Sequence, residues 1–123
     1  MNYKILDINK PTVNGRLYSK DVVDKALNDP ILQEMLKNGG VPVFKLNSAD
    51  VFEATSVGAF DMSKVVGFVK KFDLSDTALY VDIEFINDYS PEQVFALGTG
   101  DVSYINGLDF VDIYNLTALY IKE

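Results

Sequence analysis

The sequence has 123 residues, 48% hydrophobic and 24% charged, which is typical of one globular domain and excludes a disordered tail. Eighteen acidic residues against eleven basic ones give a formal net charge of -7, so we expect no nucleic-acid partner. The lack of cysteine and histidine removes thiolate and imidazole chemistry and the usual ligands of zinc, copper, haem and iron–sulfur sites, so we expect no metal and no cofactor.

The first third of the chain predicts a strand, a tight turn and two short helices. Residues 3–8 alternate as a strand does, and Asn14-Gly15 is a turn signal because both residues tolerate positive φ. Ser19 is suited to cap a helix, and Asp29-Pro30 to begin another, because proline fits the first helical position. Two short helices, or one kinked helix, therefore fill the segment up to Gly39.

The middle of the chain predicts three strands and a long loop. The strands are residues 41–46, 65–72 and 79–86. The last of them alternates apolar and polar residues, as a half-buried antiparallel strand does, and the polar turn at 73–77 joins it to the strand before. Residues 47–63 show no period, so we expect a functional or mobile loop there.

The C-terminal part predicts one more helix and two strands. Ser90-Pro91-Glu92 repeats the capping signature and predicts a helix that ends at Gly98. Residues 101–105 and 110–121 are rich in β-branched and aromatic residues and flank a turn at Asn106-Gly107. The last strand is apolar on both faces, so we expect it to be central in the sheet or covered by a partner.

Together these elements predict a single α+β domain spanning residues 1–123. We expect a mainly antiparallel sheet or small barrel of about six strands with two or three short helices. No apolar run reaches signal-peptide or membrane-helix length, so we expect no secretion signal and no membrane.

Several segments, in order, resemble one family. Asn14-Gly15-Arg16-Leu17-Tyr18 before a helix resembles the N-G-R-x-Y entry segment of tailed-phage prohead maturation proteases, and strands 65–69 and 79–85 look like paired strands of that family. The stretch from Gly100 to Gly107 looks like the G-x-S-x-x-G segment of the family, which implies that Ser103 stands where the nucleophile would. The resemblance covers nearly the whole chain and implies a prohead-protease-like fold.

One position departs from the family pattern. Where the family has its catalytic histidine, the comparable strand ends near Asn47, and the chain has no histidine at all. A serine needs a neighbouring base to take its proton, and asparagine is no base. The resemblance therefore implies an inactive relative. The alternative is that Lys45 acts as the base for Ser103, whereas the plainer interpretation of Ser103 is a strand serine whose hydroxyl faces solvent.

Five residues are candidates for binding. Arg16 is suited to clamp a carboxylate with two hydrogen bonds, or else to fix the turn after Gly15 through a salt bridge or stacking. Four tyrosines are candidate interface residues, with ordinary core and cross-strand pairing as the alternative: Tyr18, Tyr104, Tyr114 and Tyr120.

The lack of a base and of metal ligands favours a binding role. The resemblance implies its setting: a non-catalytic structural protein of a phage virion, an auxiliary or decoration capsid protein that binds the major capsid protein or other virion proteins. Its expected place is the capsid, and the host cytoplasm during assembly, and further copies of itself are a second expected partner. The alternatives are a capsid maturation serine protease that uses Ser103 with a base other than histidine, and a generic protein-interaction module. The sequence leaves open the oligomeric state and the face of the shell.

Overall fold

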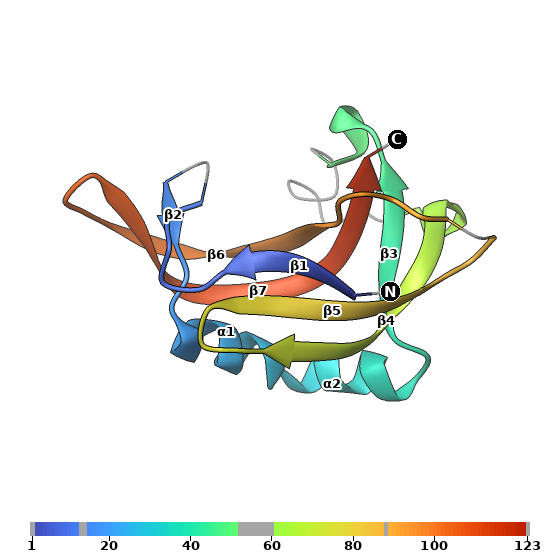
Figure 1. Cartoon of the computed structure of the whole chain (residues 1–123), viewed down its shortest axis with the longest axis horizontal. Coiled ribbons are helices and arrows are strands. Elements are labelled where there is room, and N and C mark those ends of the chain that lie inside the picture. Colours follow the sequence, from blue (N-terminus) through green and yellow to red (C-terminus); the bar gives the residue numbers. More distant parts are fainter. Residues whose placement is uncertain (1, 13–14, 52–60, 88, 123) are drawn as a thin grey trace.

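Within the residues that the structure describes, seven strands and three short helices with defined bounds follow one another along the chain (Figure 1). The computed structural model describes residues 2–12, 15–51, 61–87 and 89–122. The elements in order are β1 (Asn2–Asp7), β2 (Arg16–Leu17), α1 (Lys20–Leu27), α2 (Pro30–Lys37), β3 (Val41–Leu46), the 3₁₀ helix η1 (Met62–Lys64), β4 (Val65–Leu74), β5 (Ala78–Phe85), β6 (Phe95–Ile105) and β7 (Leu108–Lys122). None of the helices within these ranges is long and apolar enough to cross a bilayer.

All seven strands belong to one curved sheet. Its order is β1-β5-β4-β3-β7-β2, and β6 pairs with β7. β2 and β3 run parallel to β7, while the other pairs are antiparallel, so the sheet is mixed and holds one strand more than predicted. The sequence did not reveal the parallel pairs because they join strands that are far apart in the chain, whereas side-chain alternation reports only on the strand itself. β7 is central, as predicted from its two apolar faces.

The two α-helices form where the capping residues predict them. The Ser19 hydroxyl accepts a hydrogen bond from the Val22 amide at 3.2 Å, and the Asp29 carboxylate accepts one from the Ile31 amide at 2.8 Å. α1 packs against β7 and β4, and α2 packs against β3 and β4. In Figure 1 α1 and α2 lie together at the bottom of the molecule, whereas β1 and β6 lie in its upper part.

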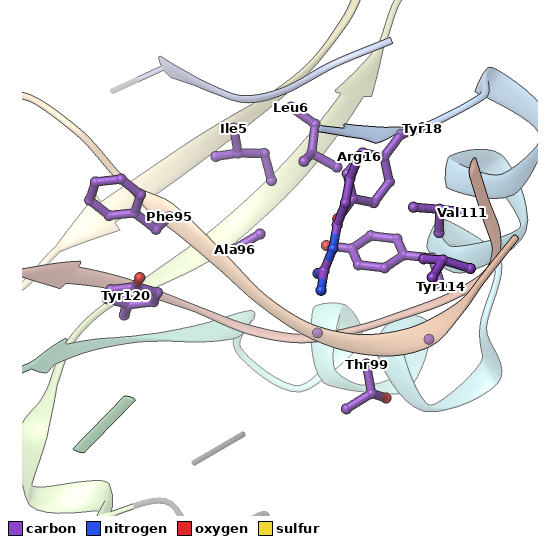
Figure 2. Close-up of a pocket in the computed structure, with 13 residues that line it drawn as sticks. Ile5, Leu6, Arg16, Tyr18, Phe95, Ala96, Thr99, Val111, Tyr114 and Tyr120 are labelled. Carbon is purple, nitrogen blue, oxygen red and sulfur yellow. The ribbon is translucent and has the colours of Figure 1, made fainter. Parts of the chain in front are cut away.

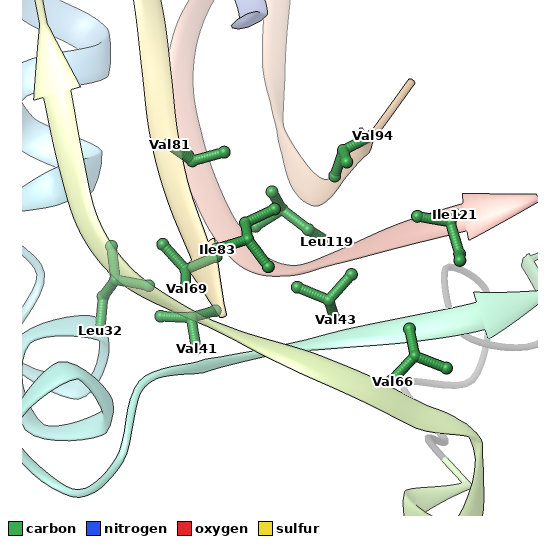
Figure 3. Packing of buried hydrophobic residues seen from close by; sticks show 10 residues of the cluster. All are labelled: Leu32, Val41, Val43, Val66, Val69, Val81, Ile83, Val94, Leu119 and Ile121. Atoms are coloured by element: carbon green, nitrogen blue, oxygen red, sulfur yellow. The ribbon is translucent and has the colours of Figure 1, made fainter. Parts of the chain in front are cut away.

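The main core lies inside the curve of the sheet (Figure 3). It consists of ten buried aliphatic side chains from α2, the strands β3, β4, β5 and β7, and the segment before β6: Leu32, Val41, Val43, Val66, Val69, Val81, Ile83, Val94, Leu119 and Ile121. Full burial of one such side chain stabilises the fold by about 1.5–3 kcal/mol, so this cluster is the main source of stability. A smaller cluster around Phe44 and Leu46 covers the other face of β3, which explains why both faces of that strand carry apolar residues.

Two bulges bend β7 and shape the sheet. The register with β6 shifts twice, which leaves Asp112 and Thr117 of β7 as extra residues. Both reach back to β6: the Thr117 hydroxyl donates to the Leu97 carbonyl at 3.0 Å, and the Asp112 carboxylate accepts from the Ser103 hydroxyl at 2.5 Å. Because each bulge increases local bending and twist, two bulges five residues apart curve the long β6–β7 hairpin.

The predicted helix ending at Gly98 does not form, and that prediction is wrong. Residues 91–94 are irregular, and Phe95 begins an eleven-residue strand. A helix of two turns has little stability of its own, whereas the apolar residues from Phe95 onward gain a long ladder of backbone hydrogen bonds by pairing with β7 along one edge. Gly98, which was interpreted as the helix end, and Gly100 instead lie where a β-carbon would collide with the β7 backbone.

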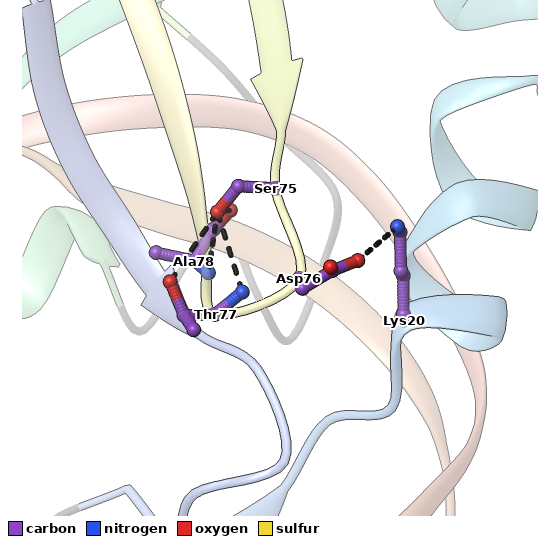
Figure 4. Close-up of polar contacts among 5 residues, drawn as sticks. All are labelled: Lys20, Ser75, Asp76, Thr77 and Ala78. Carbon is purple, nitrogen blue, oxygen red and sulfur yellow. Dashed lines mark hydrogen bonds and ion pairs between the residues drawn. The ribbon is translucent and has the colours of Figure 1, made fainter.

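The turn between β4 and β5 is held by its own polar side chains, as predicted (Figure 4). The Ser75 hydroxyl accepts hydrogen bonds from the amides of Thr77 at 3.3 Å and Ala78 at 3.1 Å. Asp76 forms an ion pair with Lys20 of α1 at 2.5 Å, which ties this turn to the first helix. The partner lowers the pKa of the Asp76 carboxyl and raises the pKa of the Lys20 ammonium.

Candidate binding site on the open side of the sheet

A pocket of about 500 Å³ lies where the curved sheet remains open, between β1 and β6 (Figure 2). We call it the β1–β6 pocket. Its wall includes Ile5 and Leu6 of β1, Arg16 of β2, Tyr18, and the β6 backbone around Gly98. The remaining lining residues come from β6 and β7: Phe95, Ala96, Thr99, Gly100, Val102, Val111, Tyr114 and Tyr120. The structure thus brings four of the five predicted binding residues to one place.

Among the described residues, Arg16 is the only charged one that lines the β1–β6 pocket, and it is the only arginine of the chain. Its backbone is held by two hydrogen bonds with Thr12, one from the Thr12 amide at 2.8 Å and one to the Thr12 hydroxyl at 3.1 Å. Gly15, with φ of 75°, makes the turn that leads into it. Figure 2 shows the Arg16 side chain extending from β2 into the pocket, and it forms no ion pair within the described part of the chain.

Two aromatic pairs form opposite ends of the β1–β6 pocket. The rings of Tyr18 and Tyr114 meet edge to face with centroids 5.1 Å apart, and those of Phe95 and Tyr120 stack at 5.3 Å. Lys122 lies over the Phe95 ring, 4.8 Å from its centroid. Such pairs fix the ring positions and leave preformed apolar walls.

Burial raises the pKa of the Tyr114 phenol far above its ordinary value of 10.0, and the neighbouring Tyr18 adds to the shift. The Tyr114 hydroxyl therefore stays protonated at neutral pH. In Figure 2 it points toward the middle of the pocket, into which the Arg16 side chain also extends. The pocket thus offers a guanidinium and hydroxyl groups beside aliphatic and aromatic side chains, an arrangement suited to bind a carboxylate that carries apolar neighbours.

Ser103 and Lys45 are not brought together. Ser103 pairs with Phe110 and Lys45 with Ile121, so roughly 35 Å of β7 separates them along the strand. Ser103 donates to the Asp112 carboxylate near the hairpin end, and Lys45 lies 5.4 Å from the centroid of the Tyr89 ring. The serine and lysine that the alternative hypothesis combined thus lie in different parts of the sheet.

Asn47 caps a helical turn directly after β3. Its side-chain oxygen accepts from the Asp50 amide at 2.9 Å, and the Asp50 carboxylate accepts from the Asn47 amide at 3.3 Å, a reciprocal cap. Lys64 pairs with the same carboxylate at 2.7 Å, and together with the Asn47 amide it lowers the pKa of Asp50. The predicted loop 47–63 therefore begins as helix over residues 48–51 and ends in η1, while residues 52–60 lie outside the described residues.

No hydroxyl of β6 lies next to Asn47. Across β7, Phe95 of β6 lies opposite Phe44 of β3 and Ala96 lies opposite Val43, and neither of these β6 side chains can act as a nucleophile. A second depression of about 430 Å³ lies at this end and is lined by Leu46, Asn47, Ser48, Val51, Tyr120 and Lys122. It shares Tyr120 with the β1–β6 pocket, so the two form neighbouring parts of one surface. The described residues contain no group of acidic side chains placed to hold a metal ion.

Tyr104 is the predicted binding residue that the structure places elsewhere. It lies near the tip of the β6–β7 hairpin, where 75% of its surface is exposed, together with Ile105 and Ile113, which are both more than half exposed. Phe95, Ile5 and Leu6 belong to the pocket but were not predicted, because Phe95 was assigned to a helix and nothing local marks the two β1 residues. The spacing Gly98-Thr99-Gly100 was the sequence signal that could have indicated this pocket, since glycines within a strand often mark a place where a ligand or another backbone approaches closely.

Comparison with known proteins gives a similarity in the fold. No protein-family model matches the sequence, and the search of curated proteins gives no match. Among solved structures, the chain is similar to the capsid assembly protease gp21 of bacteriophage T4, with a TM-score of 0.79 and 15% sequence identity. The match covers 100% of this chain and 80% of that one. The chain therefore has a prohead-protease-like fold, as the sequence resemblance implied.

Proposed function

We propose that this chain is a non-catalytic protein of phage capsid assembly, which binds the major capsid protein or another virion protein and remains in the particle as an auxiliary or decoration protein. The single observation that carries the proposal is the convergence of Arg16, Tyr18, Tyr114 and Tyr120 on the β1–β6 pocket. Preformed aromatic walls with a few polar groups are typical of binding sites. The phage setting is supported by the likeness to the T4 protease.

Two further features support a binding role over a catalytic one. Ser103 has a carboxylate as its partner, and Lys45 lies far from it along β7. The position after β3, where the resemblance expects a histidine, holds the helix cap Asn47. A serine hydroxyl without an adjacent effective base is a weak nucleophile at neutral pH.

Quantitative mass spectrometry of purified particles tests this proposal. We expect the uncleaved chain in mature capsids at a fixed ratio to the major capsid protein. Its absence from mature particles, with presence only in precursors, would contradict a decoration role and favour an assembly or processing role.

A serine protease is the second candidate, and the short hydrogen bond from Ser103 to Asp112 is the observation that favours it. Asp112 is solvent-exposed, and a solvated carboxylate is a weak base for a serine hydroxyl. We therefore expect wild-type protein, Ser103→Ala and Asp112→Asn to leave purified capsid and scaffold proteins equally intact on gels and in peptide maps. Cleavage by the wild type that Ser103→Ala abolishes would establish the protease instead.

A further inference from the structure

The far end of the β6–β7 hairpin, residues 101–113, gathers exposed apolar side chains, and we call it the distal hairpin. Within the part of the chain that the structure describes, eight large hydrophobic residues are exposed, and four of them lie here: Val102, Tyr104, Ile105 and Ile113. Tyr104 is the most exposed of the eight, at 75%. Apolar patches on the surface of a soluble protein often mark the place where a partner binds.

These side chains project from both faces of the distal hairpin. Neighbours along a strand point to opposite faces, and residues directly opposite each other in an antiparallel pair share a face. Tyr104 and Ile105 therefore lie on different faces. Ile113 shares the face of Ile105, because it pairs with Asp101, which stands four positions before Ile105 on the same strand. A partner that covers these side chains must therefore enclose the hairpin in a groove, since a flat surface would reach only one face.

The distal hairpin projects from the sheet and is already ordered. In Figure 1 the joined ends of β6 and β7 reach beyond the other strands at the left of the molecule. The turn Asn106-Gly107, with φ of 52° and 82°, is of the two-residue kind that matches the twist of paired strands. The Ser103 hydroxyl also donates across the two strands to the Asp112 carboxylate. Binding of this preformed element would cost little conformational entropy.

The charges of the distal hairpin all have one sign. They are the carboxylates of Asp101, Asp109 and Asp112, and no lysine or arginine occurs between residues 95 and 121. None of the three carboxylates forms an ion pair within the described residues. Arg16 pairs with Asp109 through the backbones of β2 and β7, but its side chain extends into the β1–β6 pocket. The distal hairpin thus presents apolar side chains among negative charges that have no ion-pair partner there.

These charges specify the partner. A second copy of this chain is a poor occupant, because its distal hairpin is equally acidic and the whole chain carries a net charge of -7. Lysine or arginine on a partner would instead meet the three aspartates with opposite charge.

We infer that the distal hairpin inserts into an apolar groove of a partner protein whose rim carries lysine or arginine. Tyr104, Ile105 and Ile113 would fill the groove, and the aspartates would face the basic rim. This inference goes beyond the proposed function, because none of these three apolar residues lines the β1–β6 pocket. Absence of the chain from mature capsids would contradict the proposed function and leave this second surface unaffected.

A library of repeat proteins with a randomised concave surface tests the inference, because such surfaces form extended grooves whatever the natural partner is. Binders selected on the full chain should be richer in lysine, arginine and apolar residues than the unselected library. For the commonest binder, Tyr104→Ala and Ile105→Ala should each weaken binding by about tenfold or more, as expected when an anchor at the centre of an interface is truncated.

The chain offers a matched control for each of these substitutions. Tyr80 of β5 is 39% exposed and Ile86 is 42% exposed, and both lie outside the distal hairpin. Tyr80→Ala and Ile86→Ala should leave binding unchanged. Amide hydrogen exchange of the unaltered chain provides a further readout, since the binder should slow exchange in residues 101–113 and leave α2 unchanged. This readout stays informative even if a substituted chain folds poorly.

The salt dependence of association tests the role of the aspartates. Asp101→Asn should slow association and make it less sensitive to salt, because the attraction between exposed charges is screened by ions. Asp73→Asn, at an exposed position of β4, should change neither quantity. An equal effect of the two substitutions would overturn the basic rim.

Three other outcomes would overturn the inference. The first is a library that yields no binder, or binders without an excess of basic residues. The second is an equal loss of binding from Tyr104→Ala and Tyr80→Ala, or unchanged exchange in residues 101–113. The third is a dimer of the chain alone in analytical ultracentrifugation that Tyr104→Ala dissociates, because it would assign the distal hairpin to a second copy.

Discussion

Leu32 and Ile31 are neighbours in α2 with opposite surroundings, which makes them a matched pair for testing how this helix holds the sheet. Leu32 is 1% exposed and belongs to the main core, whereas Ile31 is 72% exposed. Leu32→Ala removes three buried carbons, worth about 2.4 kcal/mol of transfer free energy at about 0.8 kcal/mol each. The cavity left between α2 and the sheet adds about 1 kcal/mol, for a total loss of about 3 kcal/mol.

Urea and thermal unfolding measure this difference. An unfolding entropy of about 2.1 cal/mol/K per residue converts a loss of about 3 kcal/mol into a melting temperature about 12 °C lower for Leu32→Ala. Ile31→Ala should change the free energy of unfolding by less than about 0.5 kcal/mol, because an exposed side chain loses no packing and alanine favours the helix. Equal small effects of the two substitutions would refute the packing of α2 against the core.

Three further predictions concern charge and packing near the pocket and the first helix. Lys20 lowers the pKa of the Asp76 carboxyl below its ordinary value of 3.8. The ion pair therefore stabilises the fold above pH 3.8, and this stabilisation is lost as the pH falls through the pKa of Asp76 in the folded state. NMR titration of Lys20→Met should show a higher pKa for Asp76 than in the wild type. Burial raises the pKa of Tyr114 in the folded state, so at high pH this tyrosine ionises first in the unfolded chain. The free energy of unfolding should therefore be constant below about pH 10 and fall as the pH rises further. In urea unfolding Tyr114→Phe should show a smaller alkaline loss, and an unchanged loss would contradict the raised pKa of Tyr114. Gly98→Ala would place a β-carbon 2.7 Å from a β7 carbonyl oxygen, so it should lower the free energy of unfolding by about 1–3 kcal/mol, measured by chemical unfolding. The control is Thr99→Ala, which should have little effect because the neighbouring Thr99 is exposed.

Much of the local structure could be predicted because its signals lie within a few residues of one another. Ser19 and Asp29 cap their helices through amides two or three residues away. The Asn106-Gly107 turn, with φ of 52° and 82°, joins β6 to β7 because these residues adopt positive φ at low cost. The candidate binding residues could also be predicted, because arginine and tyrosine are enriched at contact surfaces and residue type alone therefore selects them.

The errors and gaps arose where distant residues decide the outcome. The segment after Pro91 carries a helix signature, yet it pairs with β7, and no local pattern reports that partner. The parallel pairing of β3 with β7 depends on how the chain between them folds back, which alternation does not encode. For the same reason the sequence could not show that Ser103 and Lys45 would lie far apart along β7.

The sequence by itself determined the helix caps, the hairpin turn, the apolar strands and the absence of histidine and cysteine, because each is a property of one residue or its near neighbours. Only the tertiary structure decided that Arg16, Tyr18, Tyr114 and Tyr120 share one pocket. Two bulges in β7 and the open gap between β1 and β6 create that pocket, and both depend on the register between strands that meet only when the whole sheet has formed.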